Sequence, residues 1–393
     1  MFDLNDIQIE RLLVKDIMST SAVTVNKGDT LAEVLARMKK DRLREVPVLD
    51  GDRPMGLVSY SSFLTRRSLP LSSKVEQVML PCPRLEEDMM LTNAVEEMMS
   101  AGVRGAPVVR AHKMVGFVSR TDVIRILPQV AQLKDKEVSS FMSTNPMSVT
   151  EAETIRHAQI LMKGLNEKAL PVVDSSKRLI GVIGMREIMD VFWTSKKAAK
   201  TPNEIMGNRN PPDINVGSIM NRPAVAVTPK DTIGRIASIM LDKHLSTVFV
   251  QEDGRLVGVV SQADLMEQVV GLKPREGVFV QLTGLDEEDP DVYDVLYGLI
   301  EKSMKRIDKI QSPKIFTVHV TIYHHEGLRS KYSLHARLTT EKSLYYASGT
   351  DWSLYKTLDA VLEQLEKSVK KESEKQRDQR RSKQPSQVPV LRS

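Results

Sequence analysis

Apolar and polar positions follow one pattern four times along the first two-thirds of the chain. Each copy opens with Val, two variable positions, an apolar residue and Met, and closes about 40 residues later with Gly, two apolar residues and Ser or Gly. The openings lie at 14–18, 75–79, 138–142 and 216–220, and the closings at 56–59, 116–119, 181–184 and 258–261. A fixed period indicates a copied supersecondary unit whose apolar face is buried against a neighbouring copy. We therefore expect a repeat array over roughly the first 270 residues.

The first copy shows which elements each unit contains. An extended stretch at 22–25 precedes Asp29 and Thr30, which we expect to cap a helix, and two strands follow at 45–49 and 55–59 before a closing helix near Ser61. The helix should bury one face formed by Leu31, Val34, Leu35 and Met38. The order is βαββα, and a unit of this size is too small to stand alone. The fold class expected is therefore α/β, with four βαββα repeats in two paired modules.

After Pro274 the periodicity changes and predicts a second domain of order βαβββα, an α+β sandwich. A strand at 278–282 precedes a helix that begins at Asp289 and Pro290 and runs to about residue 310, and a final helix opens at Asp351. Three strands are expected between the helices, and one face of each should be directed inward. The inward side chains expected are Phe316, Val318, Val320 and Ile322 on the first strand, Tyr332, Leu334, Ala336 and Leu338 on the second, and Leu344 and Tyr346 on the third. The opposite face is expected to carry His319, Tyr323, Lys331, His335, Arg337 and Tyr345.

Composition supports a globular, multidomain chain in the cytoplasm. The 393 residues are 41% apolar and 27% charged, no apolar run is long enough to span a bilayer, and the N-terminus lacks the order of a signal peptide. The domains expected are a pair of repeats at 7–133, a third repeat at 134–193, a linker at 194–215, a fourth repeat at 216–270, a separate domain at 277–371 and a basic, flexible tail at 372–393. The single cysteine, Cys82, excludes an intrachain disulfide and has no activating neighbour.

Positive charge is concentrated at the C-terminal end. The whole chain has a formal charge of +5, whereas residues 295–393 contain 19 Lys and Arg against 11 Asp and Glu. One stripe of cations is expected on the first helix of the last domain and a second near the end of the final helix: Lys302, Lys305, Arg306, Lys309, Lys370 and Lys371. Such rows suit the phosphates of structured RNA, although basic residues near helix C-termini also complement the helix dipole without any partner.

The repeats resemble the cystathionine β-synthase (CBS) domain family, in which two copies form a Bateman module with clefts for adenosine-containing ligands. In that family the segment Gly, two apolar residues, Ser or Thr, two variable positions and Asp supplies a hydroxyl near the phosphate and a carboxylate for the ribose hydroxyls. The second copy matches in full at 116–122 and the fourth at 258–264. The first copy has Ser62 in place of the carboxylate, and the third has Glu187 together with Gly184 in place of the hydroxyl.

The resemblance implies that each pair keeps one intact cleft for AMP, ADP or ATP as a regulatory ligand, with no cofactor required. The implied binding residues are Ser119, Arg120, Thr121, Asp122, Ser261 and Asp264, and Arg125 is a further candidate for a phosphate contact. The turn also places these groups at a helix N-terminus, where free N–H groups favour phosphate. The alternative is that Asp122 and Asp264 only cap their helices, which is the commonest role of Asp before an apolar helix.

The last domain resembles the small-subunit-binding domain of ribosome hibernation-promoting factors. The resemblance rests on residues 280–284, 299–302, 318–320, 351–359 and 364–367. The family's domain occupies the groove of the small subunit where messenger and transfer RNA bind, so the resemblance implies that ribosomal RNA is a partner. Lys331 and Arg337 then join the helix cations as candidate RNA-binding residues. The acidic stretch at 286–289 departs from the family pattern.

The hypothesis drawn from both halves is a non-enzymatic factor that inhibits translation on the ribosome under the control of adenosine nucleotides. No set of side chains resembles a catalytic centre. No metal is expected, since His319 and His335 have no nearby carboxylate or thiolate. Two alternatives stay open: a nucleotide-sensing regulatory subunit or transcriptional regulator, and an array with empty clefts that serves as a docking surface held by Arg42, Arg44, Arg66 and Arg67. Homo-oligomerisation through the CBS modules is also possible, and no membrane contact is expected.

Overall fold

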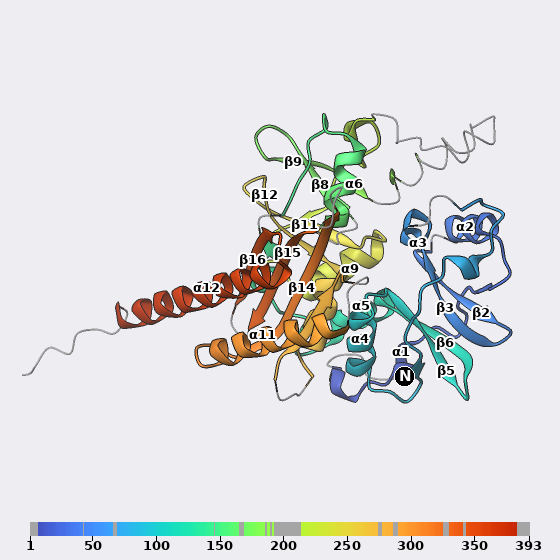
Figure 1. Cartoon of the computed structure of the whole chain (residues 1–393), viewed down its shortest axis with the longest axis horizontal. Coiled ribbons are helices and arrows are strands. Elements are labelled where there is room, and N and C mark those ends of the chain that lie inside the picture. The colour runs from blue at the N-terminus through green and yellow to red at the C-terminus, as the bar shows by residue number, and fades with distance from the viewer. Residues whose placement is uncertain are drawn as a thin grey trace, which may run out of the picture. The chain divides into compact units, whose positions relative to one another are not determined.

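The computed structural model separates into two compact units, residues 1–274 and 275–393. It describes residues 7–41, 43–65, 69–144, 146–164, 169–184, 187–188, 191, 214–273, 277–285, 290–324, 330–340 and 343–382. The linker expected at 194–215 lies almost wholly outside the described residues, as do Arg42, Arg66 and Arg67 of the docking alternative. Each unit is described by itself below (Figure 1).

Unit 1 consists of four copies of the predicted repeat, and the βαββα order is described in full for the first, second and fourth. The first contains α1 (Val14–Ile17), β1 (Val25–Asn26), α2 (Leu31–Lys40), β2 (Glu45–Asp50), β3 (Arg53–Ser59) and α3 (Tyr60–Thr65). The second contains η2 (Val75–Gln77), β4 (Leu85–Glu86), α4 (Leu91–Ser100), β5 (Gly105–Arg110), β6 (Lys113–Ser119) and α5 (Arg120–Ile126), followed by η3 (Leu127–Gln129). The third contains η4 (Val138–Ser140), β7 (Ser143–Thr144), α6 (Ile155–Gly164), β8 (Ala169–Val173) and β9 (Leu179–Gly184). The fourth contains η5 (Val216–Ser218), β10 (Ala226–Val227), α9 (Ile233–Asp242), β11 (Thr247–Glu252), β12 (Arg255–Ser261) and α10 (Gln262–Val270).

Helix α2 forms for the reasons that its sequence suggests. Thr30 is the N-cap and, with Glu33, forms a capping box in which each side chain accepts from the other residue's backbone N–H. The predicted apolar face is buried, and its members are Leu31, Val34, Leu35 and Met38. The extended stretch expected at 22–25 is shorter, because only Val25 and Asn26 pair in parallel with β2.

The repeats pair by exchanging their opening segments. Repeat 1 bridges Ser19 to Phe117 of repeat 2, and repeat 2 returns a bridge from Leu80 to Leu57. In the second pair, β7 lies antiparallel to β12, and Asn221 bridges Val182. Repeats 1 and 2 therefore form one module and repeats 3 and 4 the other.

This exchange explains why each copy has a Met in its opening and a Gly in its closing. A Cβ added to Gly116 would lie 2.7 Å from Met18 Sδ, and one added to Gly258 would lie 2.7 Å from Met142 Sδ. Gly56 faces the backbone of Leu80 in the same way. Only glycine permits this close approach of the partner repeat, so the two halves of the motif contact each other between repeats and not within one.

Helices join the two modules to each other within unit 1. Helix α10 packs against α4 and α5, and α9 packs against α5 and η3. The contact between modules therefore lies mainly between repeats 2 and 4. An ion pair of 2.6 Å between Lys273 and Glu96 adds to it at the end of α10, and Arg44 donates to the carbonyl of His244 at 3.3 Å.

Unit 2 has the predicted βαβββα order. Its elements are β13 (Phe279–Thr283), α11 (Pro290–Asp308), β14 (Pro313–His324), β15 (Ser330–Thr340), β16 (Leu344–Asp351) and α12 (Leu354–Ser382). The sheet order is β13-β14-β15-β16, with β13 parallel to β14 and the other pairs antiparallel. Both helices cover one face of this sheet and share its apolar core with the inward strand residues (Figure 1). Helix α12 continues to Ser382, so the tail expected from residue 372 is helical up to that point.

Two sequence predictions for unit 2 were wrong: which face of β16 is buried, and where the first helix ends. Tyr345 was expected on the outer face, but it is 8% exposed in the core and its hydroxyl donates to Gln311 Oε1 at 2.8 Å. Tyr346 was expected inside and is 38% exposed, so β16 is shifted by one residue, which reverses both faces. Ile310 was expected to be buried on the first helix, yet α11 ends at Asp308 and Ile310 is 41% exposed.

Candidate functional site

The turn between β6 and α5 places Ser119 and Asp122 in direct contact. Ser119 is the N-cap of α5, and Asp122 Oδ2 accepts from its backbone N–H at 2.9 Å and from its hydroxyl at 2.6 Å. Asp122 Oδ1 accepts from Arg125 Nη1 at 2.7 Å. Asp122 is 8% exposed, whereas the Arg125 side chain is 61% exposed. Oδ1 is therefore held by a group that can move away, and Thr121 lies exposed beside it.

The turn between β12 and α10 repeats this geometry in the fourth copy. Ser261 caps α10, and Asp264 Oδ2 accepts from the Ser261 backbone N–H at 2.6 Å. Asp264 is 4% exposed. The helix-capping alternative is thus realised at both intact motifs.

The two incomplete motifs cap their backbone as well. Ser62 Oγ accepts from the Ser59 N–H at 3.1 Å, and Glu187 Oε2 accepts from the Gly184 N–H at 3.0 Å. Capping therefore works with Ser or Glu at this position. Capping alone therefore does not explain why repeats 2 and 4 have Asp at this position.

A cluster of half-buried charges lies next to the repeat-2 motif and was missed by the sequence analysis. Arg104 donates its backbone N–H to Glu45 Oε2 at 2.8 Å, and Arg120 Nη2 donates to the carbonyl of Val103 at 3.1 Å. Burial, with the like charge of Arg120, lowers the pKa of Arg104 to about 10, and burial also lowers the pKa of Arg120. Burial raises the pKa of Glu45 despite its contacts with Arg104. Arg120, predicted as a nucleotide-binding residue, is half-buried in this cluster.

The same cluster reaches repeat 4. Arg104 Nη2 donates to Gln262 Oε1 at 2.9 Å, and the charge of Arg120 is stabilised by Glu45, Asp264 and Glu267. Arg120 Nε is buried without a hydrogen-bond partner among the described residues. The intact motifs of the two modules are therefore in electrostatic contact. Only the folded arrangement of repeats 2 and 4 could reveal this, since 140 or more residues separate the partners in sequence.

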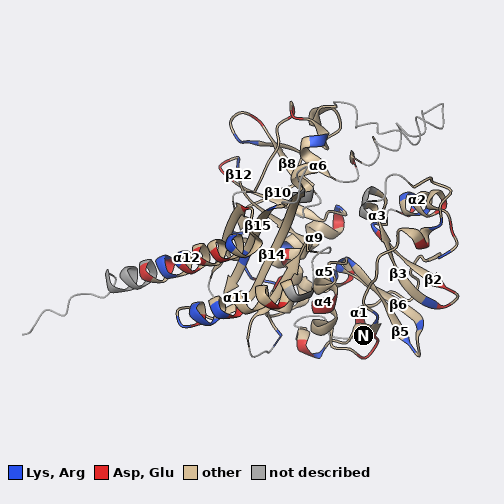
Figure 2. Cartoon of the chain, in the orientation of Figure 1, with Lys and Arg blue, Asp and Glu red and all other residues tan. Residues whose placement is uncertain are grey.

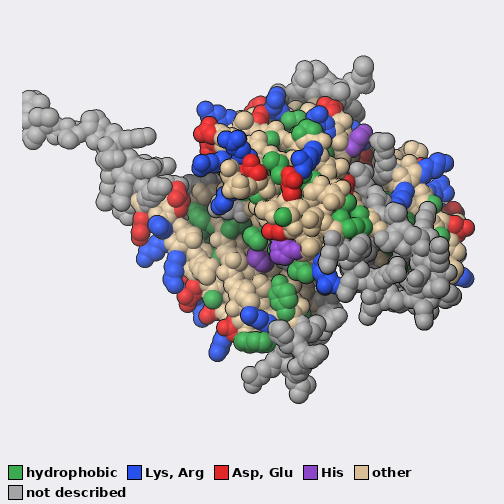
Figure 3. Space-filling view, turned by 90° about the horizontal axis from the view of Figure 1, so that it is seen from above, with side chains coloured by type: hydrophobic (Ala, Val, Ile, Leu, Met, Phe, Trp, Pro, Cys, Tyr) green, Lys and Arg blue, Asp and Glu red, His purple; other side chains and the backbone are tan. Residues whose placement is uncertain are grey.

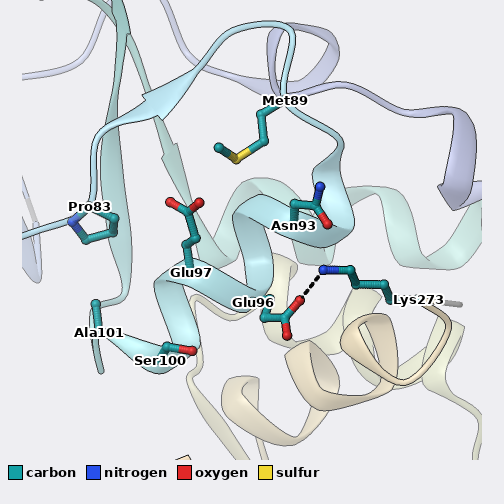
Figure 4. Close-up of a pocket in the computed structure, with 8 residues that line it drawn as sticks. All are labelled: Pro83, Met89, Asn93, Glu96, Glu97, Ser100, Ala101 and Lys273. Carbon is teal, nitrogen blue, oxygen red and sulfur yellow. Dashed lines mark hydrogen bonds and ion pairs between the residues drawn. The ribbon is translucent and has the colours of Figure 1, made fainter. Parts of the chain in front are cut away.

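A separate open pocket of about 390 Å³ lies beside α4. It is lined by Pro83, Met89, Asn93, Glu96, Glu97, Ser100, Ala101 and Lys273 (Figure 4). Figure 4 shows Lys273 reaching from the end of α10 to Glu96 on α4. None of the nucleotide-binding residues expected from the sequence lines this pocket, so we assign no nucleotide to it.

The other candidate chemistry gives no further site within the described residues. Burial raises the pKa of the Cys82 thiol to about 11, so the thiol stays protonated at neutral pH. No group of three or more His, Cys, Asp and Glu that could hold a metal ion occurs in the part of the chain that the structure describes. No described helix has the length and apolarity needed to cross a bilayer.

The cations predicted on the helices of unit 2 are all exposed, but they differ in their partners. Lys305 pairs with Glu301 at 2.6 Å on the same helix, and Arg306 Nε donates to Glu366 Oε1 of α12 at 2.9 Å. Among the described residues Lys302, Lys309, Lys370 and Lys371 have no ion-pair partner. Figure 2 shows basic residues gathered toward the C-terminal end of α11, whereas α12 carries both signs along its length. Arg306 therefore joins the two helices, and the four lysines remain available.

The remaining two predicted RNA-binding residues lie on the face of the sheet that carries no helix. Lys331 Nζ lies 5.7 Å from the centre of the Trp352 ring, and Arg337 Cζ lies 5.9 Å from the centre of the Tyr346 ring. His319 and His335 are directly opposite each other on β14 and β15, as the sequence suggested. Desolvation lowers the pKa of His335, which favours its neutral form. Histidine side chains are visible at the molecular surface in the space-filling view (Figure 3).

Several known proteins are similar to this chain. A protein of Methanocaldococcus jannaschii, MJ1404, is 26% identical over 343 residues, which cover 86% of this chain and 80% of that protein. The crystal structure of MJ1225 of the same organism, proposed to be an archaeal homologue of γ-AMPK, superimposes with a TM-score of 0.56 at 20% identity and covers 65% of this chain and 99% of that one. An L-aspartate semialdehyde sulfurtransferase of that organism is 26% identical over 179 residues, which cover 44% of this chain and 34% of the enzyme.

Family models account for both units. The CBS domain model matches residues 14–68, 75–129, 138–194 and 216–271, and the model of the C-terminal domain of hibernation factor Hib matches residues 279–387. Both resemblances noted in the sequence are confirmed by these matches. The chain belongs to the CBS domain family, with four CBS domains followed by a C-terminal domain of the hibernation factor Hib type.

Proposed function

We propose that this protein associates with the ribosome and inhibits translation through unit 2, and that adenosine nucleotides bound in unit 1 regulate it. The observation that carries the proposal is the union, on one chain, of four CBS domains with a Hib C-terminal domain. In neither unit do the described residues form a set of side chains suited to catalysis, and the proposed activity is binding.

The unpaired lysines of unit 2 support RNA as the partner. Lys302 and Lys309 on α11 and Lys370 and Lys371 on α12 are exposed cations, and each can replace a counterion on a phosphate. Helices α11 and α12 lie side by side, joined by the contacts of Ser303 and Arg306 with Glu366. This arrangement places unpaired lysines on two neighbouring helices, which suits recognition of RNA by its backbone and shape.

The nucleotide part of the proposal places one ligand at each intact motif. Asp122 and Asp264 would accept the ribose hydroxyls, and Ser119 and Ser261 would lie near the phosphate. At Asp122 the ligand has to displace Arg125 from Oδ1, which costs little because that guanidinium is mostly exposed. The freed Arg125 would then lie close to the nucleotide and could pair with its phosphate.

Sedimentation through a sucrose gradient tests ribosome association. The full chain should travel with the small subunit or the whole ribosome, and the bound fraction should fall as salt rises because phosphate contacts release counterions. The double substitution Lys302→Gln and Lys309→Gln should weaken binding and lower the slope of log affinity against log salt by about 2. Lys230→Gln, at an exposed lysine of unit 1, is the matched control and should leave the slope unchanged.

An opposite result would favour the rival class of regulatory subunit. The similarity of part of an L-aspartate semialdehyde sulfurtransferase to 44% of this chain supports this alternative. Failure of the chain to sediment with ribosomes at low salt, together with capture of one protein free of ribosomal RNA, would replace the proposal by this alternative.

A further inference from the structure

The face of the unit 2 sheet that carries no helix has side chains aligned in rows across the strands. Tyr323 on β14 is opposite Lys331 on β15, and Trp352 follows the end of β16 beside the same lysine. Further along β15 the same face carries Ser333, His335 and Arg337. His335 is opposite His319 of β14 and Ser348 of β16, and Arg337 is opposite Tyr346 of β16. The face therefore has an aromatic ring beside a cation at each end and small polar or histidine side chains between them.

The rings at the two ends are accessible. Tyr323 is 43% exposed, Tyr346 38% and Trp352 53%, although aromatic side chains of this size are normally largely buried. Each of Tyr346 and Trp352 has a cation near its ring, Arg337 and Lys331 respectively. A flat ring with a cation beside it can stack on a base while the cation contacts the adjoining phosphate.

The charge of this face is of one sign. None of its described strand positions is Asp or Glu, and they include Lys331, Arg337 and two histidines. Threonine and serine hydroxyls fill most of the remaining positions, including Thr283, whose Oγ1 lies 2.9 Å from His319 Nδ1. A face that binds a protein could equally well carry acidic or apolar side chains. The exposed rings, cations and hydroxyls found together here match the bases, phosphates and 2′-hydroxyls of RNA.

We propose that this face binds single-stranded RNA by stacking bases on Tyr346 and Trp352. We call the surface formed by Tyr323, Lys331, His335, Arg337, Tyr346 and Trp352 the stacking face. Tyr346 and Trp352 are six residues apart, which corresponds to about 20 Å along a strand. This is several times the ~3.4 Å rise of stacked bases, so the rings would hold two separate bases of one unstacked strand, with its backbone passing near His335.

The inference deepens the proposed ribosome association, on which it rests, by naming an unpaired RNA segment as a second contact besides the helix lysines. The two contacts differ in physical character. Stacking accepts any RNA base, and its contribution to affinity depends weakly on salt concentration. The contribution of the lysine contacts falls strongly as the salt concentration rises. The difference allows each to be measured without the other.

Fluorescence of Trp352 tests stacking directly. The chain has two tryptophans, so Trp193→Phe leaves Trp352 as the sole tryptophan emitter in the full-length protein. Addition of a twelve-nucleotide oligouridine RNA should quench this emission in a saturable manner, and the matching DNA should bind more weakly if the hydroxyls of the face contact the 2′-hydroxyl. Absence of quenching at RNA concentrations where binding is complete by another probe would overturn the proposal.

Substitutions separate the stacking face from the lysine rows. Trp352→Leu and Tyr346→Leu should each weaken binding of the oligouridine about tenfold and leave the salt slope unchanged. Tyr297→Leu is the matched control, because Tyr297 is 42% exposed on α11, outside the sheet. Equal RNA affinity of the three variants and the parent protein would overturn the stacking face. So would a result in which the two sheet variants no longer capture a protein partner but still bind RNA.

The same measurements distinguish failure of this inference from failure of the proposed function. Oligouridine binding that requires both rings, in a protein that does not sediment with ribosomes, supports the stacking face and rejects ribosome association. Ribosome sedimentation that persists in the double variant Tyr346→Leu and Trp352→Leu, with unchanged oligouridine affinity, rejects the stacking face alone.

Discussion

The helices that close repeats 2 and 4 begin with the same Ser-to-Asp cap but carry different charges around it. The residue after the capping serine is Arg120 in repeat 2 and Gln262 in repeat 4, and the residue three positions after the aspartate is Arg125 in one and Glu267 in the other. Both Arg120 and Gln262 donate to an equivalent carbonyl, that of Val103 or Leu245. One backbone design therefore supports a cationic motif in repeat 2 and an acidic one in repeat 4.

This difference teaches that the two intact clefts are not interchangeable. Both clefts have the aspartate, but the phosphates of a nucleotide would gain from Arg125 in repeat 2 and would be opposed by Glu267 at the equivalent position in repeat 4. Arg120, which belongs to repeat 2, is also the cation that stabilises these two acids. We expect the repeat-2 cleft to prefer more highly phosphorylated adenosine, and the repeat-4 cleft to depend on its neighbour.

The largest effect is expected at Arg120. Arg120→Gln copies the residue of repeat 4 but leaves the buried side chains of Asp264 and Glu267 without this cation, so the free energy of unfolding should fall by about 3–5 kcal/mol. Chemical denaturation followed by circular dichroism measures it. Arg125→Gln removes the same charge from an exposed side chain and should cost less than about 1 kcal/mol. Equal losses in the two variants would show that burial of Arg120 carries no special weight.

Removal of the carboxylates should produce the next largest effect. Asp122→Ala should weaken nucleotide binding at the repeat-2 cleft by roughly ten- to a hundredfold, because two charge-assisted hydrogen bonds are lost. Isothermal titration of AMP, ADP and ATP into each single variant separates the two clefts. The Asp264→Ala variant keeps the repeat-2 cleft, which should have the higher nucleotide affinity. Unchanged nucleotide binding in the double variant Asp122→Ala and Asp264→Ala would reject the assignment of both sites.

A smaller change should test the charge contrast itself. In an Asp122→Ala background, Glu267→Gln removes one acid near the repeat-4 cleft and should raise its affinity for ATP roughly fivefold. The gain should be smaller for AMP and absent for adenosine, since it depends on phosphate charge. Titration of the three ligands measures the trend, and an equal gain for all three would indicate a change in packing and not in electrostatics.

The smallest effect is expected in repeat 1, where the cap exists without the carboxylate. Ser62→Ala removes the acceptor of the Ser59 N–H and should lower stability by about 1 kcal/mol, the usual value of a cap. Nucleotide affinity should not change. A thermal melt and one titration suffice, and any loss of nucleotide binding would mean that the incomplete motif also holds a ligand.

Much of the fold followed from local sequence patterns. The four βαββα repeats, the cap at Thr30 and the buried face of α2 rest on contacts within a few residues, which sequence spacing describes well. The order of elements in unit 2 was predicted on the same grounds. The error at Tyr345 arose because two adjacent tyrosines in β16 give no clear alternation of apolar and polar positions, and a one-residue shift exchanges the faces.

The functional residues were less accessible to sequence reasoning. Ser119, Asp122, Ser261 and Asp264 could be found because their spacing is local, and the structure brings each pair into contact. The pairing of Arg306 with Glu366 could not be found, since it joins two helices that are separated by three strands in the chain. Sequence also gave no sign that Arg120 contacts the acids of repeat 4, because those residues lie more than 140 positions away in the chain.

The amino-acid sequence by itself determined the repeat unit, its caps and the glycines that recur in it, because each depends on backbone geometry over a few residues. Tertiary structure alone decided that Met18 meets Gly116 in the partner repeat and that Arg120 is buried against acids of repeat 4. Burial and long-range electrostatics depend on which surfaces meet after folding, and no local pattern records that choice.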